Sequence, residues 1–157
     1  MTDGTTSLTE TLLWGPTDDP VRHVVLFVGG YVAPFVGLFG LMLLADALGR
    51  DDVAAALYEP VLFPTLVFHS PPLVGLLNGV LGGGLLGGAV IGVTPALSVT
   101  SMLGFGWTIR YLRTGSPPRG GDSPLWALSL FFAGYGVVGS LVGTLVGMAL
   151  RVGRSVF

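Results

Sequence analysis

The chain has 157 residues, of which 51% are hydrophobic and 10% are charged, and its formal net charge at pH 7 is −2. Soluble proteins carry about 25% charged residues, so this composition excludes a conventional soluble enzyme. The net negative charge excludes a basic nucleic-acid-binding protein. Together with a mean hydropathy of +0.79, the composition predicts an all-α integral membrane protein, for which we expect the plasma membrane as the location.

The N-terminal residues form a polar, acidic tail (1–23), and a single transmembrane helical domain is expected over 24–157. The first span is predicted at 24–44, which contains no ionisable side chain, because about 20 apolar residues suffice to cross a bilayer. Ala45 and Ala47 would fit the small residues of a signal-peptide cleavage site. The apolar run is longer than the roughly 7–15 residues of a signal peptide, so we expect the span to be retained.

The next segment, 53–70, is predicted to be interfacial or re-entrant. It carries Pro60 and Pro64 and is followed by Pro71 and Pro72. Proline has no N–H to donate and disturbs a helix, so prolines at this density argue against a simple crossing.

Residues 73–109 contain no ionisable side chain, and as one helix they would be nearly twice as long as the bilayer core is thick. Thr94 and Pro95 offer a break, since Thr can cap a helix and Pro is favoured at its first position. Two spans are therefore predicted, at 73–93 and 95–112. A single kinked helix is the alternative.

A polar loop rich in Pro, Gly and Ser is predicted at 113–124, followed by the last span at 125–150. The expected total is four spans, within a range of three to five. On this topology the two sides differ by one Arg, which is too small a difference for the positive-inside rule to predict an orientation.

Glycine spacing is the most specific feature of the sequence. Residues i and i+4 lie on one face of a helix, and a face without side chains lets a neighbouring backbone approach closely, as helices do in lipid. The predicted helix-packing residues recur at this spacing and are Gly75, Gly79, Gly83, Gly87, Gly84, Gly88, Gly92, Gly139, Gly143 and Gly147.

The first span carries a similar small-residue face, formed by Gly29, Ala33 and Gly37. Two interpretations are open: these faces form an oligomerisation surface, or they pack against one another within one chain. The pattern resembles the glycine-zipper helices of some channels and of rotary ATPase rings, but it identifies no family. The spans also lack the membrane-buried carboxylate that such a ring requires.

The sequence predicts no catalytic, cofactor-binding or metal-binding residues. It contains no cysteine, no GxSxG motif and no clustered metal ligands. The weak functional candidates are Glu59 and His69, which could mark the two ends of the interfacial segment or line a polar cavity; the simpler interpretation is that both are solvated. Asn78, inside a predicted span, is expected to hydrogen-bond across helices.

These observations predict a structural or accessory subunit that acts through helix–helix packing. Its expected partners are the lipid bilayer and either a second copy of itself or another membrane protein. The alternative is a small oligomeric transporter or channel that uses the Pro- and Gly-broken middle segment as its pathway. An enzyme is not expected, nor is a cofactor.

Overall fold

The computed structural model describes residues 7–115 and 125–154, and these residues form helices without any strand. In chain order the elements are α1 (Leu8–Trp14), α2 (Pro20–Ala47), α3 (Asp51–Leu57), the π-helical segment η1 (Tyr58–His69), α4 (Ser70–Val80), α5 (Leu85–Thr114) and α6 (Leu125–Arg154). Four helices are long and apolar enough to cross a membrane: α2, the continuous helix Asp51–Val80, α5 and Trp126–Arg154 within α6. The prediction of an all-helical chain with four such helices is confirmed for the described residues.

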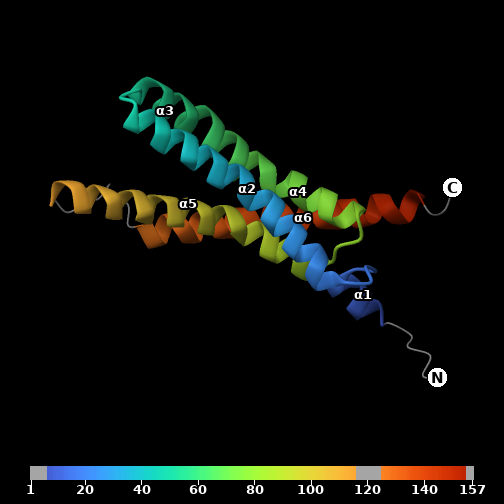
Figure 1. Cartoon of the computed structure of the whole chain (residues 1–157). Coiled ribbons are helices and arrows are strands. Elements are labelled where there is room, and N and C mark those ends of the chain that lie inside the picture. The colour runs from blue at the N-terminus through green and yellow to red at the C-terminus, as the bar shows by residue number, and fades with distance from the viewer. Residues whose placement is uncertain (1–6, 116–124, 155–157) are drawn as a thin grey trace.

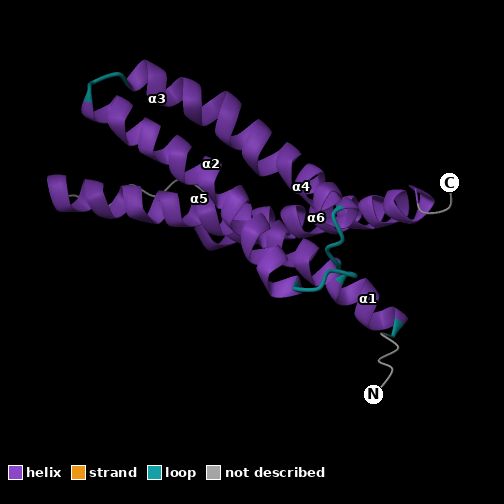
Figure 2. Cartoon of the chain, turned by 45° about the vertical axis from the view of Figure 1, so that its right-hand side comes forward, coloured by secondary structure: helices purple, strands orange, loops and turns teal. Residues whose placement is uncertain are grey.

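Successive long helices run in opposite directions and form two hairpins. The first consists of α2 and the helix Asp51–Val80, and the second consists of α5 and α6 (Figure 1). The hairpins cross near α4, where α6 packs against both α4 and α5, and α2 contacts α5. Beyond the crossing, the α2–α3 corner and the far end of α5 diverge. Both chain termini lie at the other end of the molecule (Figures 1 and 2).

Local sequence signals set the ends of the helices. Asp19 caps α2, because its side chain accepts a hydrogen bond from the backbone N–H of Arg22 (2.9 Å), and Pro20 then opens the helix. The end of α5 is marked by Gly115, whose φ of 64° lies in the left-handed region that favours glycine. Of the predicted polar loop 113–124, residues 116–124 lie outside the described residues.

The predicted break at Thr94 and Pro95, between spans 73–93 and 95–112, is wrong. The chain instead turns between Val80 and Leu85, and α5 runs through Pro95. Three consecutive glycines form this turn, and Gly82 adopts a φ of 94°, which L side chains rarely adopt. Thr94 does not cap a new helix, because its hydroxyl donates back to the Val90 carbonyl one turn earlier (3.0 Å).

The prediction of a separate interfacial segment at 53–70 is also wrong, because these residues continue into α4 as one helix (Figure 2). Side chains supply donors that the prolines lack. Ser70 N–H donates to the Thr65 carbonyl and Pro71 has no N–H, so neither residue gives a backbone donor to the Leu66 carbonyl. The Tyr31 hydroxyl of α2 donates to that carbonyl (3.2 Å), as does the Ser70 hydroxyl.

A side-chain donor also replaces a backbone donor two residues along, at the Phe68 carbonyl. Pro72 cannot donate to the Phe68 carbonyl, which accepts from the Tyr135 hydroxyl of α6 (3.2 Å). The proline-rich helix is thus completed by donors from helices on both sides of it. Such repair by neighbouring helices is what allows proline within apolar helices.

The apolar core lies where α2, η1, α5 and α6 meet. Its buried residues are Tyr31, Phe35, Leu38, Leu62, Val67, Ile91, Ala96, Val99 and Phe132. Phe132 is also at the centre of an aromatic group, with ring centroids 5.7 Å from Phe63 and 5.9 Å from Phe68. The core fixes the two hairpins relative to each other in the middle of the molecule.

Candidate functional site

The helices α4 and α6 make a close backbone contact. A Cβ atom added at Gly75 would lie under 3.0 Å from the Ser140 backbone, and one at Gly79 would lie 2.8 Å from the Met148 nitrogen and nearer still to the Thr144 carbonyl oxygen. Real Cβ atoms do not lie this close to backbone. These two positions therefore require glycine.

The α6 side of the contact uses glycine in the same way. A Cβ atom at Gly143 would lie 2.8 Å from the Leu76 nitrogen, and one at Gly147 would lie 2.8 Å from the Val80 nitrogen. Gly139 is less crowded, at 3.3 Å from the Pro72 ring. The two backbones therefore touch along more than two turns, with no side chain between them.

The glycines of the predicted second span do not form one continuous row, because α4 ends at Val80. Gly83 and Gly84 belong to the turn, where a Cβ at Gly84 would meet the backbone of Leu13 in α1. Gly87, at the start of α5, faces the side chain of Val24 in α2 (3.2 Å). The predicted four-residue row is thus divided between α4, the turn and α5.

Contacts between α5 and α6 use the remaining glycines. A Cβ at Gly88 would lie 2.6 Å from the Thr144 hydroxyl oxygen, and one at Gly92 would lie 2.5 Å from the Val137 Cα. Gly92 also faces Gly136, a contact that the sequence prediction missed. The signal was present, since Gly136 precedes Ser140 and Thr144 at four-residue spacing.

The small-residue face of α2 behaves differently. A Cβ atom at Gly29 or Gly37 would have no described atom within 4 Å, and both positions are exposed, as is Ala33 between them. The predicted glycine faces of α4 and α6 are thus used within the chain, whereas this face of α2 is open, as are Gly104, Gly106 and Gly134 on the other helices.

Near the turn, a buried polar cluster joins all four long helices. Asn78 is fully buried; its Nδ2 donates to the Gly84 carbonyl and to the Thr144 hydroxyl (both 3.3 Å), and its Oδ1 lies 3.1 Å from His23 Nε2. The Thr144 hydroxyl in turn donates to the Gly75 carbonyl (3.1 Å). Because an amide oxygen only accepts, Nε2 of His23 carries the proton in this contact. The cluster is a set of hydrogen bonds suited to holding helices in register.

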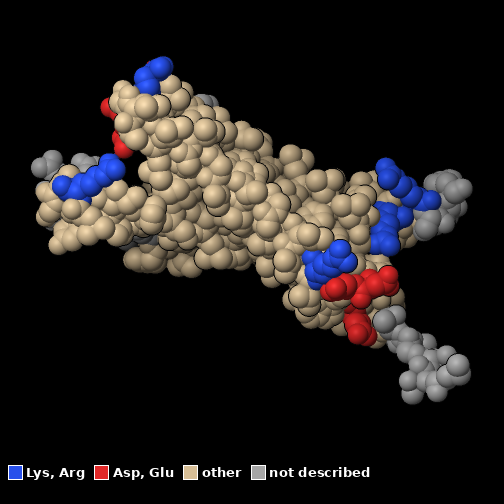
Figure 3. Space-filling model, in the orientation of Figure 1, with Lys and Arg blue, Asp and Glu red and all other residues tan. Residues whose placement is uncertain are grey.

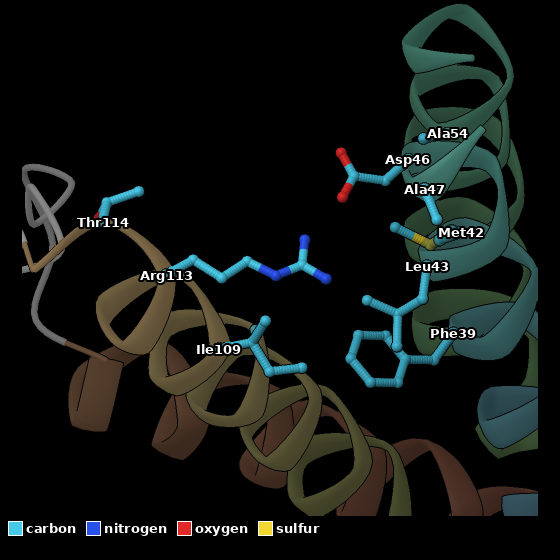
Figure 4. A pocket seen from close by; sticks show the side chains of 10 residues that line it. Phe39, Met42, Leu43, Asp46, Ala47, Ala54, Ile109, Arg113 and Thr114 are labelled. Carbon is cyan, nitrogen blue, oxygen red and sulfur yellow. The ribbon is translucent and has the colours of Figure 1, made fainter. Parts of the chain in front are cut away.

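At the opposite end, a pocket of about 580 Å³ opens between the α2–α3 corner and the last turns of α5 (Figure 4). Its apolar lining includes Phe39, Met42, Leu43 and Ile109. These residues come from two different hairpins, so the pocket is a consequence of their divergence.

Two opposite charges stand at the mouth of this pocket. Asp46 projects from the last turn of α2 and Arg113 from the last turn of α5, and their side chains extend toward each other from opposite walls (Figure 4). Both are exposed, and they do not pair with each other: among the described side chains, the ion pair within 4.0 Å joins Arg50 and Asp52. The pocket therefore offers an apolar floor with one carboxylate and one guanidinium above it.

The structure does not bring together the weak candidates from the sequence. Glu59 and His69 lie near opposite ends of the π-helical segment η1, ten residues apart in the chain, and both are exposed. His69 Nδ1 donates to the Pro64 carbonyl. Within the part of the chain that the structure describes, no group of three or more His, Cys, Asp or Glu side chains could hold a metal ion.

The described residues thus form an all-helical fold with four candidate membrane spans, a polar cluster at one end and a charged pocket at the other. Comparison of the chain with protein-family models, with curated proteins and with solved structures gave no match. We therefore infer its function from the arrangement of its own residues.

Proposed function

We propose that the chain is an integral membrane protein that acts as a structural or accessory subunit through helix–helix packing. The distribution of polarity supports the membrane part of this proposal. Large apolar side chains such as Leu26, Leu97 and Leu130 are more than 60% exposed on the outer faces of the long helices. Charged side chains gather at the two ends of the molecule, and the middle of the face in Figure 3 shows none.

Such a surface is unfavourable in water, where monomeric proteins rarely expose apolar patches of more than a few hundred Å². In a bilayer the same surface is solvated by acyl chains, and the charges at both ends lie at head-group depth. The plasma membrane stays our prediction for its location.

The open small-residue face of α2 is the observation that carries the packing role. Glycine lowers helix stability by up to about 1 kcal/mol relative to Ala, and at the four-residue spacing of α4 and α6 it allows two backbones to touch. At Gly29 and Gly37 no described atom of the chain makes such a contact. A helix from outside the chain would supply it.

We assign this face to a second copy of the chain. A two-fold axis places the same surface of both partners in contact, and a small-xxx-small face is complementary to itself. Ala33 completes the spacing between the two glycines. A dimer built on α2 would leave the contacts of α4, α5 and α6 undisturbed.

The transporter or channel alternative receives less support. Its pathway would use the proline-containing middle segment, but that segment is part of a continuous helix, and the α4 and α6 backbones leave no space between them. Solute flux into liposomes that contain the purified protein, absent from empty liposomes, would favour the alternative.

The membrane part is tested by alkaline carbonate extraction of membranes from expressing cells. We expect the protein to remain in the pellet, and its release into the soluble fraction would contradict insertion. The packing part is tested by cross-linking and sedimentation of the full chain in mild detergent, comparing wild type with the double variant Gly29→Leu/Gly37→Leu.

We expect a dimer for the wild type and a monomer for the double variant. Gly134→Leu in α6 is the matched control, because Gly134 is also exposed with no described atom within 4 Å of an added Cβ, and it should stay dimeric. A wild-type monomer, or a double variant that dimerises as well as the control, would overturn the assignment of this face.

A further inference from the structure

The pocket between Asp46 and Arg113 has a use that helix packing does not require. We propose that it binds a phospholipid whose head group ends in a primary ammonium, with the ammonium at Asp46 and the phosphate at Arg113. The inference rests on the proposed membrane location but not on the dimer.

The charges of the pocket match the two charges of such a head group. A guanidinium binds phosphate oxygens through paired N–H donors, and a carboxylate accepts hydrogen bonds from an ammonium. Asp46 and Arg113 face each other across the opening without forming an ion pair, so both remain available (Figure 4). A molecule that carries one charge would leave the other side chain unpaired.

The depth of the pocket fits a lipid better than a soluble zwitterion. Asp46 and Arg113 each lie next to the last residue of their helix, where a membrane span reaches the head groups. Phe39 lies two turns, about 10 Å, before Asp46 along α2, and Ile109 lies one turn, about 6 Å, before Arg113 along α5. The charged mouth and the apolar floor therefore follow the order of head group and acyl chain.

The volume of the pocket and the need for N–H donors at Asp46 narrow the choice of ligand head group further. A volume of about 580 Å³ lies within the roughly 300–1,000 Å³ of ligand pockets. A trimethylated ammonium has no N–H to donate to Asp46, and an anionic head group would place negative charge beside it. Phosphatidylethanolamine can pair with both Asp46 and Arg113, whereas phosphatidylcholine and phosphatidylglycerol can each pair with Arg113 alone.

Native mass spectrometry of the delipidated full chain, with these three lipids as probes, tests the proposal. We expect the wild type to bind phosphatidylethanolamine about ten-fold more tightly than the other two, which corresponds to one charge-assisted hydrogen bond. Asp46→Asn should remove the preference over phosphatidylcholine while keeping phosphate binding. Arg113→Gln should weaken binding of all three, and Asp51→Asn, a carboxylate at the same end but outside the pocket, should change nothing.

Equal affinity of the wild type for phosphatidylethanolamine and phosphatidylcholine would overturn the proposal, as would an unchanged preference in Asp46→Asn. Displacement of the lipid by an equal concentration of soluble phosphoethanolamine would overturn the lipid assignment in favour of a soluble zwitterion. Circular dichroism confirms that each variant is folded, and Asp46→Asn, which keeps the side-chain shape, carries the test if Arg113→Gln does not fold. A protein that stays in carbonate-washed membranes yet shows no lipid preference would disprove this site alone, whereas release by carbonate would disprove the membrane location.

Discussion

Replacing Gly143 by Ala tests the backbone contact between α4 and α6 with the smallest available change. The added Cβ atom would lie 2.8 Å from the Leu76 nitrogen and nearer still to the Pro72 carbonyl oxygen, both of which are backbone atoms. Backbone cannot rotate out of the way as a side chain can. The two helices must therefore move apart locally.

The free-energy cost of Gly143→Ala can be estimated from the distance between the added Cβ atom and the α4 backbone. Restoring an ordinary van der Waals distance requires a shift of about 1 Å, and a gap of that size removes roughly a quarter to a half of the dispersion energy of the contacts around it. Overpacking of this kind typically costs about 1–3 kcal/mol. The higher helix propensity of Ala returns up to about 1 kcal/mol, so we expect a net loss of about 1 kcal/mol from the free energy of unfolding.

Gly134→Ala is the matched control. It makes the same chemical change in the same helix, but an added Cβ at Gly134 meets no described atom within 4 Å. The control should gain up to about 1 kcal/mol from helix propensity alone. Because this gain is common to both variants, they should differ by the overpacking cost of about 2 kcal/mol, and in sign.

Unfolding of the full chain by sodium dodecyl sulfate in mixed micelles, followed by circular dichroism, measures both variants. The midpoint should fall for Gly143→Ala and rise slightly for Gly134→Ala. Midpoints that shift in the same direction by similar amounts would show that α4 and α6 do not touch at Gly143, and the packing argument would fail.

Three further predictions are tested in the same titration. Asn78→Leu removes three hydrogen bonds, each worth about 0.6 kcal/mol on average between apolar helices. We therefore expect the free energy of unfolding to fall by about 2 kcal/mol. A neutral effect would contradict the buried cluster. Tyr31→Phe removes the hydroxyl that donates to the Leu66 carbonyl and should cost about 0.6–1 kcal/mol. Tyr58→Phe is the control and should cost less, because the Tyr58 hydroxyl has no partner among the described residues. Equal losses would refute the role of Tyr31. Gly82→Ala places a side chain at a φ of 94° and should cost about 1–2 kcal/mol, and a stabilised protein would show that the turn is formed differently.

The number of apolar helices could be predicted from the sequence because hydropathy depends on residues that are adjacent in the chain. The prediction placed the turn between the second and third helices at Thr94 and Pro95 and treated the glycines before Leu85 as part of a helix, and it was wrong. Pro95 keeps its place inside α5, while the glycines before Leu85 form the turn, with Gly82 at positive φ. In an apolar helix proline is tolerated when its neighbours compensate, so its presence alone does not locate an end.

Other features depend on residues far apart in the sequence. The helical state of the proline-rich segment relies on hydroxyl donors from Tyr31 and Tyr135, which lie on other helices and carry no sequence signal of that role. Asp46 and Arg113 are separated by two helices in the chain, and only the crossing of the hairpins places them on opposite walls of one pocket. Local pattern could not predict either arrangement.

The two ends of the molecule are held together by different means, and this difference explains why the pocket exists where it does. At the end with the chain termini, glycine allows the backbones of α4 and α6 to touch, and Asn78 links them to α2 and to the start of α5. Asn78 links α2 to the start of α5, and because these two helices cross at an angle, their other ends separate (Figure 1). Gly106 and Ala47 line the gap, and both are small. The pocket therefore lies where α2 and α5 diverge, at the opposite end from the Asn78 cluster and the α4–α6 contact.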